Sequence, residues 1–153
     1  MTIRENAQAV IDRLAATLQC GPLAFNADDR VEFGLDEDMG AIIYLSEETQ
    51  SIVVSVIPGR VGDDDADLLF DLLCGNYMWG FTGGGNMGVD RATGLLSIHR
   101  AVELPLDLAA DPTAFEDVFA ALVGAARYWR QRLDPRATTT ASVPAADMGM
   151  IRI

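Results

Sequence analysis

The closest match to a chemical motif in this chain is the segment Gly83-Gly84-Gly85-Asn86-Met87-Gly88. It satisfies the pattern G-x-G-x-x-G, whose glycines let backbone amides approach the pyrophosphate of a dinucleotide. Such a site needs a strand before the glycines and a helix that begins among them. Here a predicted helix comes before, and Val89-Asp90 and a turn follow. We therefore expect glycines that bend a strand or admit a second backbone, not a nucleotide site.

His99 is the only histidine and the residue best suited to acid–base chemistry near neutral pH. No cysteine or second histidine stands at a spacing that would complete a metal site with it. A Ser-His-Asp triad would have to recruit one of four scattered serines, none in a nucleophile elbow: Ser46, Ser51, Ser55 and Ser97. The pattern favours a half-buried strand histidine with a local hydrogen bond and Arg100 on the opposite face. A small enzyme using His99 or the glycine segment is the less favoured alternative.

The third candidate site is a cluster of four aspartates at positions 63, 64, 65 and 67. Clustered carboxylates suit hard divalent cations, but the spacing, the glycine and the closing glutamate of an EF-hand are missing. A helix start explains the same cluster, because a carboxylate caps the first turn and negative charge is favourable there. We therefore expect no metal, no cofactor and no catalysis.

The charge of the chain restricts its partners. The 153 residues include 23 acidic and 11 basic side chains, for a net charge of −12. A surface of this sign repels phosphate backbones, so we expect no nucleic-acid partner, and it attracts a basic or unfolded polypeptide. No signal sequence and no apolar run of about 18 residues is recognisable, so we expect neither export nor membrane insertion. Cys20 and Cys74 form no C-x-x-C pair, which favours buried free thiols in a reducing cytoplasm.

Hydrophobic periodicity predicts the elements of the first half. Apolar residues recur every three or four positions from Ile3 to about Cys20, which predicts an amphipathic helix that ends at Gly21-Pro22. Alternation from Val31 to Leu35 predicts a strand with one wet face. Two further strands, 41–46 and 51–57, are joined by a short polar link and extend an antiparallel meander.

The next helix is apolar on more than one face. We expect Pro58 to Gly62 to end the sheet and a helix to follow from about Asp65 to Asn76. In a chain of this size, one side of that helix can cover its own sheet while the other needs a partner. The aromatic connector from Tyr77 to Phe81 fits the core and an interface equally well.

A hairpin and a last helix complete the pattern. Strands are expected over 83–90 and 95–102, turned at Arg91-Ala92-Thr93-Gly94. An apolar stripe over about five turns predicts a helix from Asp111-Pro112 to Asp134-Pro135. The order α-β-β-β-α-β-β-α predicts an α+β fold with one antiparallel sheet. Residues 1–135 form the domain, and residues 136–153, poor in bulky apolar side chains, are expected to be a flexible tail.

Several short segments in this order resemble the class I type III secretion chaperone family, the Tir chaperone or CesT-like proteins. They are Leu72-Leu73-Cys74-Gly75-Asn76, Met87-Gly88-Val89-Asp90, Thr93-Gly94-Leu95-Leu96-Ser97-Ile98, Leu104-Pro105-Leu106 and Ala126-Arg127-Tyr128-Trp129. The likeness covers about residues 3–133. It implies a homodimer in the bacterial cytoplasm that binds the N-terminal segment of a secreted effector. The effector segment would be kept extended and secretion-competent without ATP, in the service of virulence.

The resemblance also implies site residues. Effector contacts fall on the first helix and the early sheet: Leu14, Leu18, Val31, Phe33, Leu35 and Ile43. Dimer contacts fall on the second helix and the strand after it: Leu68, Leu69, Leu72 and Met87. An extended segment would add to a sheet edge and place apolar side chains in grooves. Core packing explains each of these residues equally well. The alternative function is a regulatory protein-binding module of the same fold that recognises a folded partner.

Overall fold

A computed structural model of the chain describes residues 1–35, 38–62 and 64–133. The elements follow the predicted order, which confirms the α+β fold. They are α1 (Ile3–Thr17), β1 (Arg30–Gly34), β2 (Gly40–Ser46), β3 (Ser51–Arg60), α2 (Ala66–Asn76), the 3₁₀ turn η2 (Tyr77–Trp79), β4 (Asn86–Val89), β5 (Leu95–Glu103) and α3 (Ala114–Arg130). The expected tail, 136–153, lies outside the described residues.

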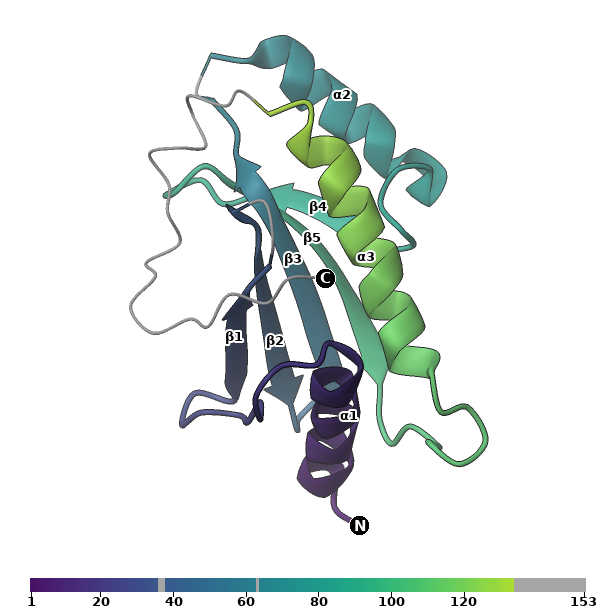
Figure 1. Ribbon diagram of the computed structural model, residues 1–153. Helices are drawn as coiled ribbons and strands as arrows, with labels where there is room; N and C mark the ends of the chain where they lie inside the picture. The colour runs from purple at the N-terminus through teal and green to yellow at the C-terminus, as the bar shows by residue number, and fades with distance from the viewer. Residues whose placement is uncertain (36–37, 63, 134–153) are drawn as a thin grey trace.

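The five strands form one antiparallel sheet in the order β1-β2-β3-β5-β4. The helices α1 and α3 lie on the same face of this sheet, and α2 lies near β4 and the C-terminal half of α3 (Figure 1). The strands β1 and β4 are therefore the two edges. Each edge strand has one side of its backbone turned away from the sheet, which makes these strands the natural places for another chain to pair.

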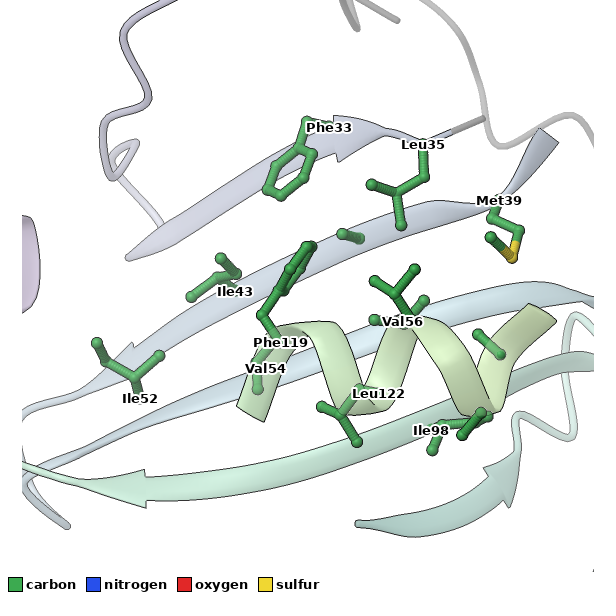
Figure 2. Close-up of a cluster of buried hydrophobic side chains, with 14 of the residues drawn as sticks. Phe33, Leu35, Met39, Ile43, Ile52, Val54, Val56, Ile98, Phe119 and Leu122 are labelled. Atoms are coloured by element: carbon green, nitrogen blue, oxygen red, sulfur yellow. The ribbon is translucent and has the colours of Figure 1, made fainter. Parts of the chain in front are cut away.

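The core lies between α3 and the inner face of the sheet. In Figure 2, Phe119 and Leu122 of α3 lie among the sheet side chains Phe33, Val54 and Ile98. All five are at most 2 % exposed, and the rings of Phe33 and Phe119 are tilted with centroids 5.9 Å apart. Inward residues alternate with outward ones along β1 and β2, as the period of two predicts.

The prediction that Pro58 to Gly62 end the sheet is wrong for Pro58 to Arg60. The strand β3 continues to Arg60, and its register against β5 shifts between Val56 and Gly59. Pro58 falls inside this irregularity, where its missing N–H costs no ladder bond. Gly59 has φ 151°, which glycine adopts without strain. The segment predicted to end the sheet is therefore an irregularity within β3, and the strand continues beyond it.

Three element boundaries also differ from the prediction. The helix α1 ends at Thr17, and Gln19 then adopts φ 53°. The helix α3 begins at Ala114, with Thr113 and not Asp111 as its N-cap. Asp107 closes a separate turn before the helix, and its carboxylate accepts from Ala109 and Ala110 N–H. The strand β4 begins only at Asn86, after the glycines.

Candidate polypeptide-binding surface

The outer edge of β1 carries unused backbone groups. Leu45 N–H donates to Asp29 C=O and Leu35 N–H donates to Met39 C=O, so the odd residues of this segment bond to β2. By alternation, the even residues Arg30, Glu32 and Gly34 turn their N–H and C=O outward.

Among the described residues, only Arg30 has a partner for these outward groups. Asn26 N–H donates to Arg30 C=O at 2.8 Å, and Asn26 Oδ1 accepts from Arg30 N–H at 3.0 Å. No described residue bonds to the outward backbone groups of Glu32 and Gly34. The side chain of Glu32 is exposed and Gly34 is buried. The edge of β1 therefore offers two successive donor–acceptor pairs to an added strand.

The outer edge of β4 is largely closed. Asp90 N–H donates to Leu95 C=O, which leaves Met87 and Val89 with outward groups. The side-chain amide of Asn76 takes both groups of Met87, accepting its N–H at 2.7 Å and donating to its C=O at 3.1 Å. The Asn76 amide thus takes the hydrogen bonds that one residue of a neighbouring strand would take. The edge of β1 therefore has more backbone groups without a described partner than the edge of β4.

The structure places most of the residues assigned to effector binding in the core. Leu14, Val31, Phe33, Leu35 and Ile43 are at most 3 % exposed, so their side chains pack inside the subunit. Leu18 is partly buried, as are Leu23 and Phe25 in the segment that leads to β1. Direct effector contact by the six residues stays a prediction. In this fold Val31 and Phe33 bond to β2 and lie on the same strand as Glu32 and Gly34, whose outward backbone groups have no described partner.

The outward side of α2 is an exposed apolar surface. We call it the α2 face: Leu69, Phe70, Leu73, Cys74 and Tyr77. The exposed fractions of Phe70, Leu73 and Tyr77 are 66 %, 70 % and 78 %, and Cys74 is exposed too, which corrects the prediction that it is buried. Contiguous apolar surface of this kind marks an interaction site in a soluble protein.

The connector after α2 extends this surface. Met78 and Trp79 both have φ 55°, a left-handed conformation that is strained for residues other than glycine. Their side chains are 73 % and 59 % exposed, and Phe81 is 52 % exposed. Trp129 Nε1 holds the connector by donating to Phe81 C=O at 2.8 Å, and the Phe81 ring stacks on Tyr128. The structure thus favours the interface interpretation of the aromatic connector.

The four residues assigned to the dimer interface divide between two sides of α2. Leu68, Leu72 and Met87 are at most 9 % exposed and pack against the core, whereas Leu69 is 40 % exposed. Their role in a dimer stays a prediction. Phe70 and Leu73, which the sequence assignment left out, are the most exposed large hydrophobic residues of the helix. The available signal was their helical spacing, because Phe70 and Leu73 are three positions apart, Leu73 is four from Leu69, and Phe70 is four from Cys74.

The other sequence candidates take structural roles. Gly83 and Gly85 lie against the backbones of Ala121 and His99, as expected for glycines that admit a second backbone. His99 is half-buried, with Nδ1 3.4 Å from Ser97 Oγ, and no described carboxylate bonds to the ring.

Asp65 caps α2 by accepting from Leu68 N–H at 3.0 Å, whereas Asp63 lies outside the described residues. Within the described ranges, no three metal-ligating side chains come together. The same ranges hold no helix long and apolar enough to cross a membrane.

The turn between β4 and β5 is fixed by one carboxylate. Asp90 accepts from the Thr93 hydroxyl, and from Ala92 and Thr93 N–H. These bonds, that of the Thr93 hydroxyl first, lower the pKa of Asp90. They hold the hairpin that positions β4 beside α2.

A free sheet edge and an exposed apolar helix define a protein that binds other polypeptides. Residues 9–130 match the Tir chaperone protein (CesT) family, so the chain belongs to this family. The membership confirms the resemblance seen in the sequence. A search of the curated proteins gave no match.

Three solved structures share the fold. A chain in the crystal structure of the ExsC-ExsE complex aligns with TM-score 0.70 and 20 % identity, covering 88 % of this chain and 98 % of that one. The HopA1-SchA chaperone–effector complex gives 0.66 and 16 %, with coverage of 84 % and 95 %. The heterodimeric ExoU-SpcU complex from the type III secretion system of Pseudomonas aeruginosa gives 0.62 and 18 %, with coverage of 82 % and 98 %.

Proposed function

We propose that this protein is a type III secretion chaperone and not an enzyme. It binds the N-terminal segment of a secreted effector in the bacterial cytoplasm and keeps that segment extended and secretion-competent without ATP. Membership of the Tir chaperone protein (CesT) family supports this function, as does the fold shared with one chain of a chaperone–effector complex. The lack of a carboxylate partner for His99 among the described residues speaks against the alternative of a small enzyme.

The observation that carries the proposal is the open edge of β1. An extended effector segment pairs there with the outward groups of Glu32 and Gly34, and its backbone hydrogen bonds supply binding that depends little on sequence. The partly buried side chains Leu18, Leu23 and Phe25 give its apolar residues a place to pack. The net charge of −12 favours a segment that carries arginine or lysine.

We further propose that two copies associate through the α2 face. An isologous contact brings the same surface of each subunit together, so one exposed apolar helix is enough to form it. Leu69, Phe70 and Leu73 form its centre, and the aromatic connector forms its border. Leu68, Leu72 and Met87 act behind this surface by holding α2 on the subunit core.

The variant Glu32→Pro tests the client edge. Proline removes the outward N–H of Glu32, a group that β2 does not use, so the sheet keeps its own ladder. Glu32→Ala is the matched control, because it removes the same carboxylate and keeps the N–H. We expect the proline variant to bind the co-purified product of a neighbouring gene at least about tenfold more weakly than the alanine variant, a loss of about 1.4 kcal/mol.

Equal affinity of the two variants, measured by calorimetry at matched thermal stability, would place the client elsewhere. Limited proteolysis of the complex then tests the state of the client. Protection of one short segment, in a client that is otherwise cleaved, supports the chaperone. A client that is folded and resistant throughout would instead support the regulatory binding module.

A further inference from the structure

The open edge of β1 is short, and this limits how a client strand can pair with it. Asn26 takes both outward backbone groups of Arg30, so an added strand cannot pair at that residue. The outward N–H and C=O groups of Glu32 and Gly34 have no described partner. A bound strand therefore pairs with these two residues. Because side chains alternate along a strand, this pairing also decides which face of the sheet each client side chain meets.

The carboxylate of Glu32 lacks a strong partner at this edge. Its ion pair with Arg30 is long, with 3.9 Å between Arg30 Nη1 and Glu32 Oε1, which exceeds the length of a hydrogen bond. The two side chains are 52 % and 43 % exposed, so the pair contributes little to stability. On β2, the residue opposite Glu32 is Ile42, which carries no charge. A cation on a client strand would therefore meet a carboxylate that no described residue hydrogen-bonds.

The neighbours of Glu32 on the strand face the opposite side of the sheet. Val31 and Phe33 are at most 3 % exposed and belong to the core between the sheet and the helices. Directly opposed residues point to the same face, so client residues opposite Val31 and Phe33 would share this apolar face. A charged side chain there would lose its water without gaining a partner. The inner positions of a bound strand therefore require apolar side chains.

We propose that β1 selects a client strand with a basic residue between two apolar residues, the basic residue lying opposite Glu32. This inference rests on the proposed function in taking β1 as the client edge. The triplet is the same in both directions, so it applies to a parallel and to an antiparallel client. Arginine suits the position best, because its planar guanidinium can donate two parallel bonds to a carboxylate. A shift by one residue would put the arginine on the apolar face, so the charge also fixes the register of the client.

The same carboxylate excludes other strands. An acidic residue opposite Glu32 would be repelled, since like charges directly opposite each other destabilise a sheet. A second copy of β1 paired about Glu32 would bring two Glu32 carboxylates together, so the edge also resists pairing with itself. Selection thus combines attraction of one class of strand with rejection of others. The net charge of −12 attracts basic chains in general, whereas Glu32 positions one particular basic residue.

Two peptides that differ in one side chain test this selection. Thr-Val-Arg-Val-Thr and Thr-Val-Glu-Val-Thr, both with blocked termini, are titrated to millimolar concentration into the isotope-labelled full chain, where NMR detects weak binding. The amide signals of Glu32 and Gly34 report the pairing directly. We expect the arginine peptide to bind the wild type at least about fivefold more tightly than the glutamate peptide, because an attractive cross-strand pair replaces a repulsive one.

Three variants separate the local pair from the net charge. Glu32→Gln keeps the N–H and the shape of the side chain, and it should bring the two affinities close together. Glu32→Arg should reverse the preference. Glu103→Gln is the matched control, because it removes the same charge from an exposed residue of β5, inside the sheet order and away from the open edge. This control should keep the preference of the wild type.

The inference is overturned by equal affinity of the two peptides for the wild type, or by a preference that survives Glu32→Gln. An equal loss of preference in Glu103→Gln would also overturn it, because the net charge would then be the cause.

The titration keeps this inference apart from the proposed function. Peptides that shift the Glu32 and Gly34 signals with equal affinity reject the selection and leave β1 as a client edge. Peptides that bind elsewhere, or do not bind at millimolar concentration, also reject the selection, and the comparison of Glu32→Pro with Glu32→Ala then decides about the client edge. If the co-purified client fails to bind a protein that shows the peptide preference, only the proposed function is rejected.

Discussion

Asparagine side chains bond to both backbone groups of one residue at two places in this fold, once on the edge strand β4 and once in the segment after β5. Asn76 bonds to both backbone groups of Met87, and Asn6 bonds in the same way to Leu106, at 2.9 Å for each bond. An amide carries one acceptor and one donor at the spacing of a peptide group, so it completes a ladder position without adding a residue to the sheet. At β1, Asn26 does the same for Arg30 with one backbone and one side-chain group.

Asn76→Ala should destabilise the protein because it leaves the Met87 N–H and C=O without partners near a buried side chain. We expect a loss of about 1–3 kcal/mol in the free energy of unfolding, measured with urea. Asn26→Ala is the matched control, since Asn26 is exposed and keeps its backbone bond to Arg30. A control that loses as much as Asn76→Ala would contradict this account of the edges.

Asp90 should make the hairpin sensitive to acid. Hydrogen bonds from the Thr93 hydroxyl, and from Ala92 and Thr93 N–H, favour the carboxylate and lower its pKa in the folded state. Its contribution to stability is therefore present above the unfolded pKa of about 3.9 and is lost as pH falls through the lower folded value.

The measurement is an NMR titration of the Asp90 carboxyl carbon, in which Thr93→Val should raise the pKa toward its usual value. An unchanged pKa in this variant would assign the shift to another cause.

At the scale of elements, a glycine lets α2 approach α3. The Cβ of an alanine at position 75 would collide with the Trp129 ring and lie 2.9 Å from Met87 Cε. From sequence, Gly75 only weakens the end of a helix. In the fold it lets α2 come close enough to α3 for Asn76 to reach β4. Gly75 thus lowers the intrinsic helix propensity of α2 but allows α2, α3 and β4 to pack closely.

Gly75→Ala should therefore destabilise the protein by about 1–3 kcal/mol through overpacking, in spite of the better helix former. Gly124→Ala is the matched control, and it should change the free energy of unfolding in the opposite direction. Gly124 is exposed in α3, its added Cβ would meet no atom within 4 Å, and alanine should stabilise the helix by up to about 1 kcal/mol. Urea unfolding measures the free energy of unfolding of both variants. Stabilisation by Gly75→Ala would contradict the prediction and show that the Trp129 ring moves aside at little cost.

The sequence predicts the elements better than the faces that they present. Alternation in β1 and β2 and the stripe of α3 are local patterns, so the order of elements follows from them. For α2 the pattern has two apolar sides, and nothing local tells which side meets the sheet. The assignment therefore chose Leu68 and Leu72, which are buried, and left out Phe70 and Leu73, which are exposed. Pairing across distance, such as that of Asn76 with Met87, leaves no local signal.

At the scale of the molecule, the two proposed interfaces lie at opposite edges of one sheet. The strand order puts β1 at one edge, and β4, with α2 beside it, at the other. A dimer formed through the α2 face thus leaves both copies of the β1 edge available. One effector chain can then contact two edges in turn, and linked contacts raise the overall affinity through effective concentration.

The cysteines of the chain report on the proposed dimer without engineering new ones. Cys74 is exposed on the α2 face and Cys20 is partly buried near the end of α1. In an isologous contact a residue near the two-fold axis approaches its own copy. Cys20→Ser, which keeps Cys74, should therefore be joined into a covalent dimer by a short bismaleimide. Cys74→Ser, which keeps Cys20, should stay monomeric on a denaturing gel.

Two neighbouring leucines separate loss of the dimer from loss of the fold. Leu73 is 70 % exposed and Leu72 is 5 % exposed. Leu73→Asp places its charge on the α2 face, so it should give a monomer by light scattering, abolish cross-linking through Cys74 and keep the thermal midpoint of the isolated fold. Leu72→Asp buries an unpaired carboxylate and should unfold the subunit. A charge buried in the contact between two copies of the α2 face would be unfavourable, so a dimer that survives Leu73→Asp would place the interface away from α2. A cross-link through Cys20 would lead to the same conclusion.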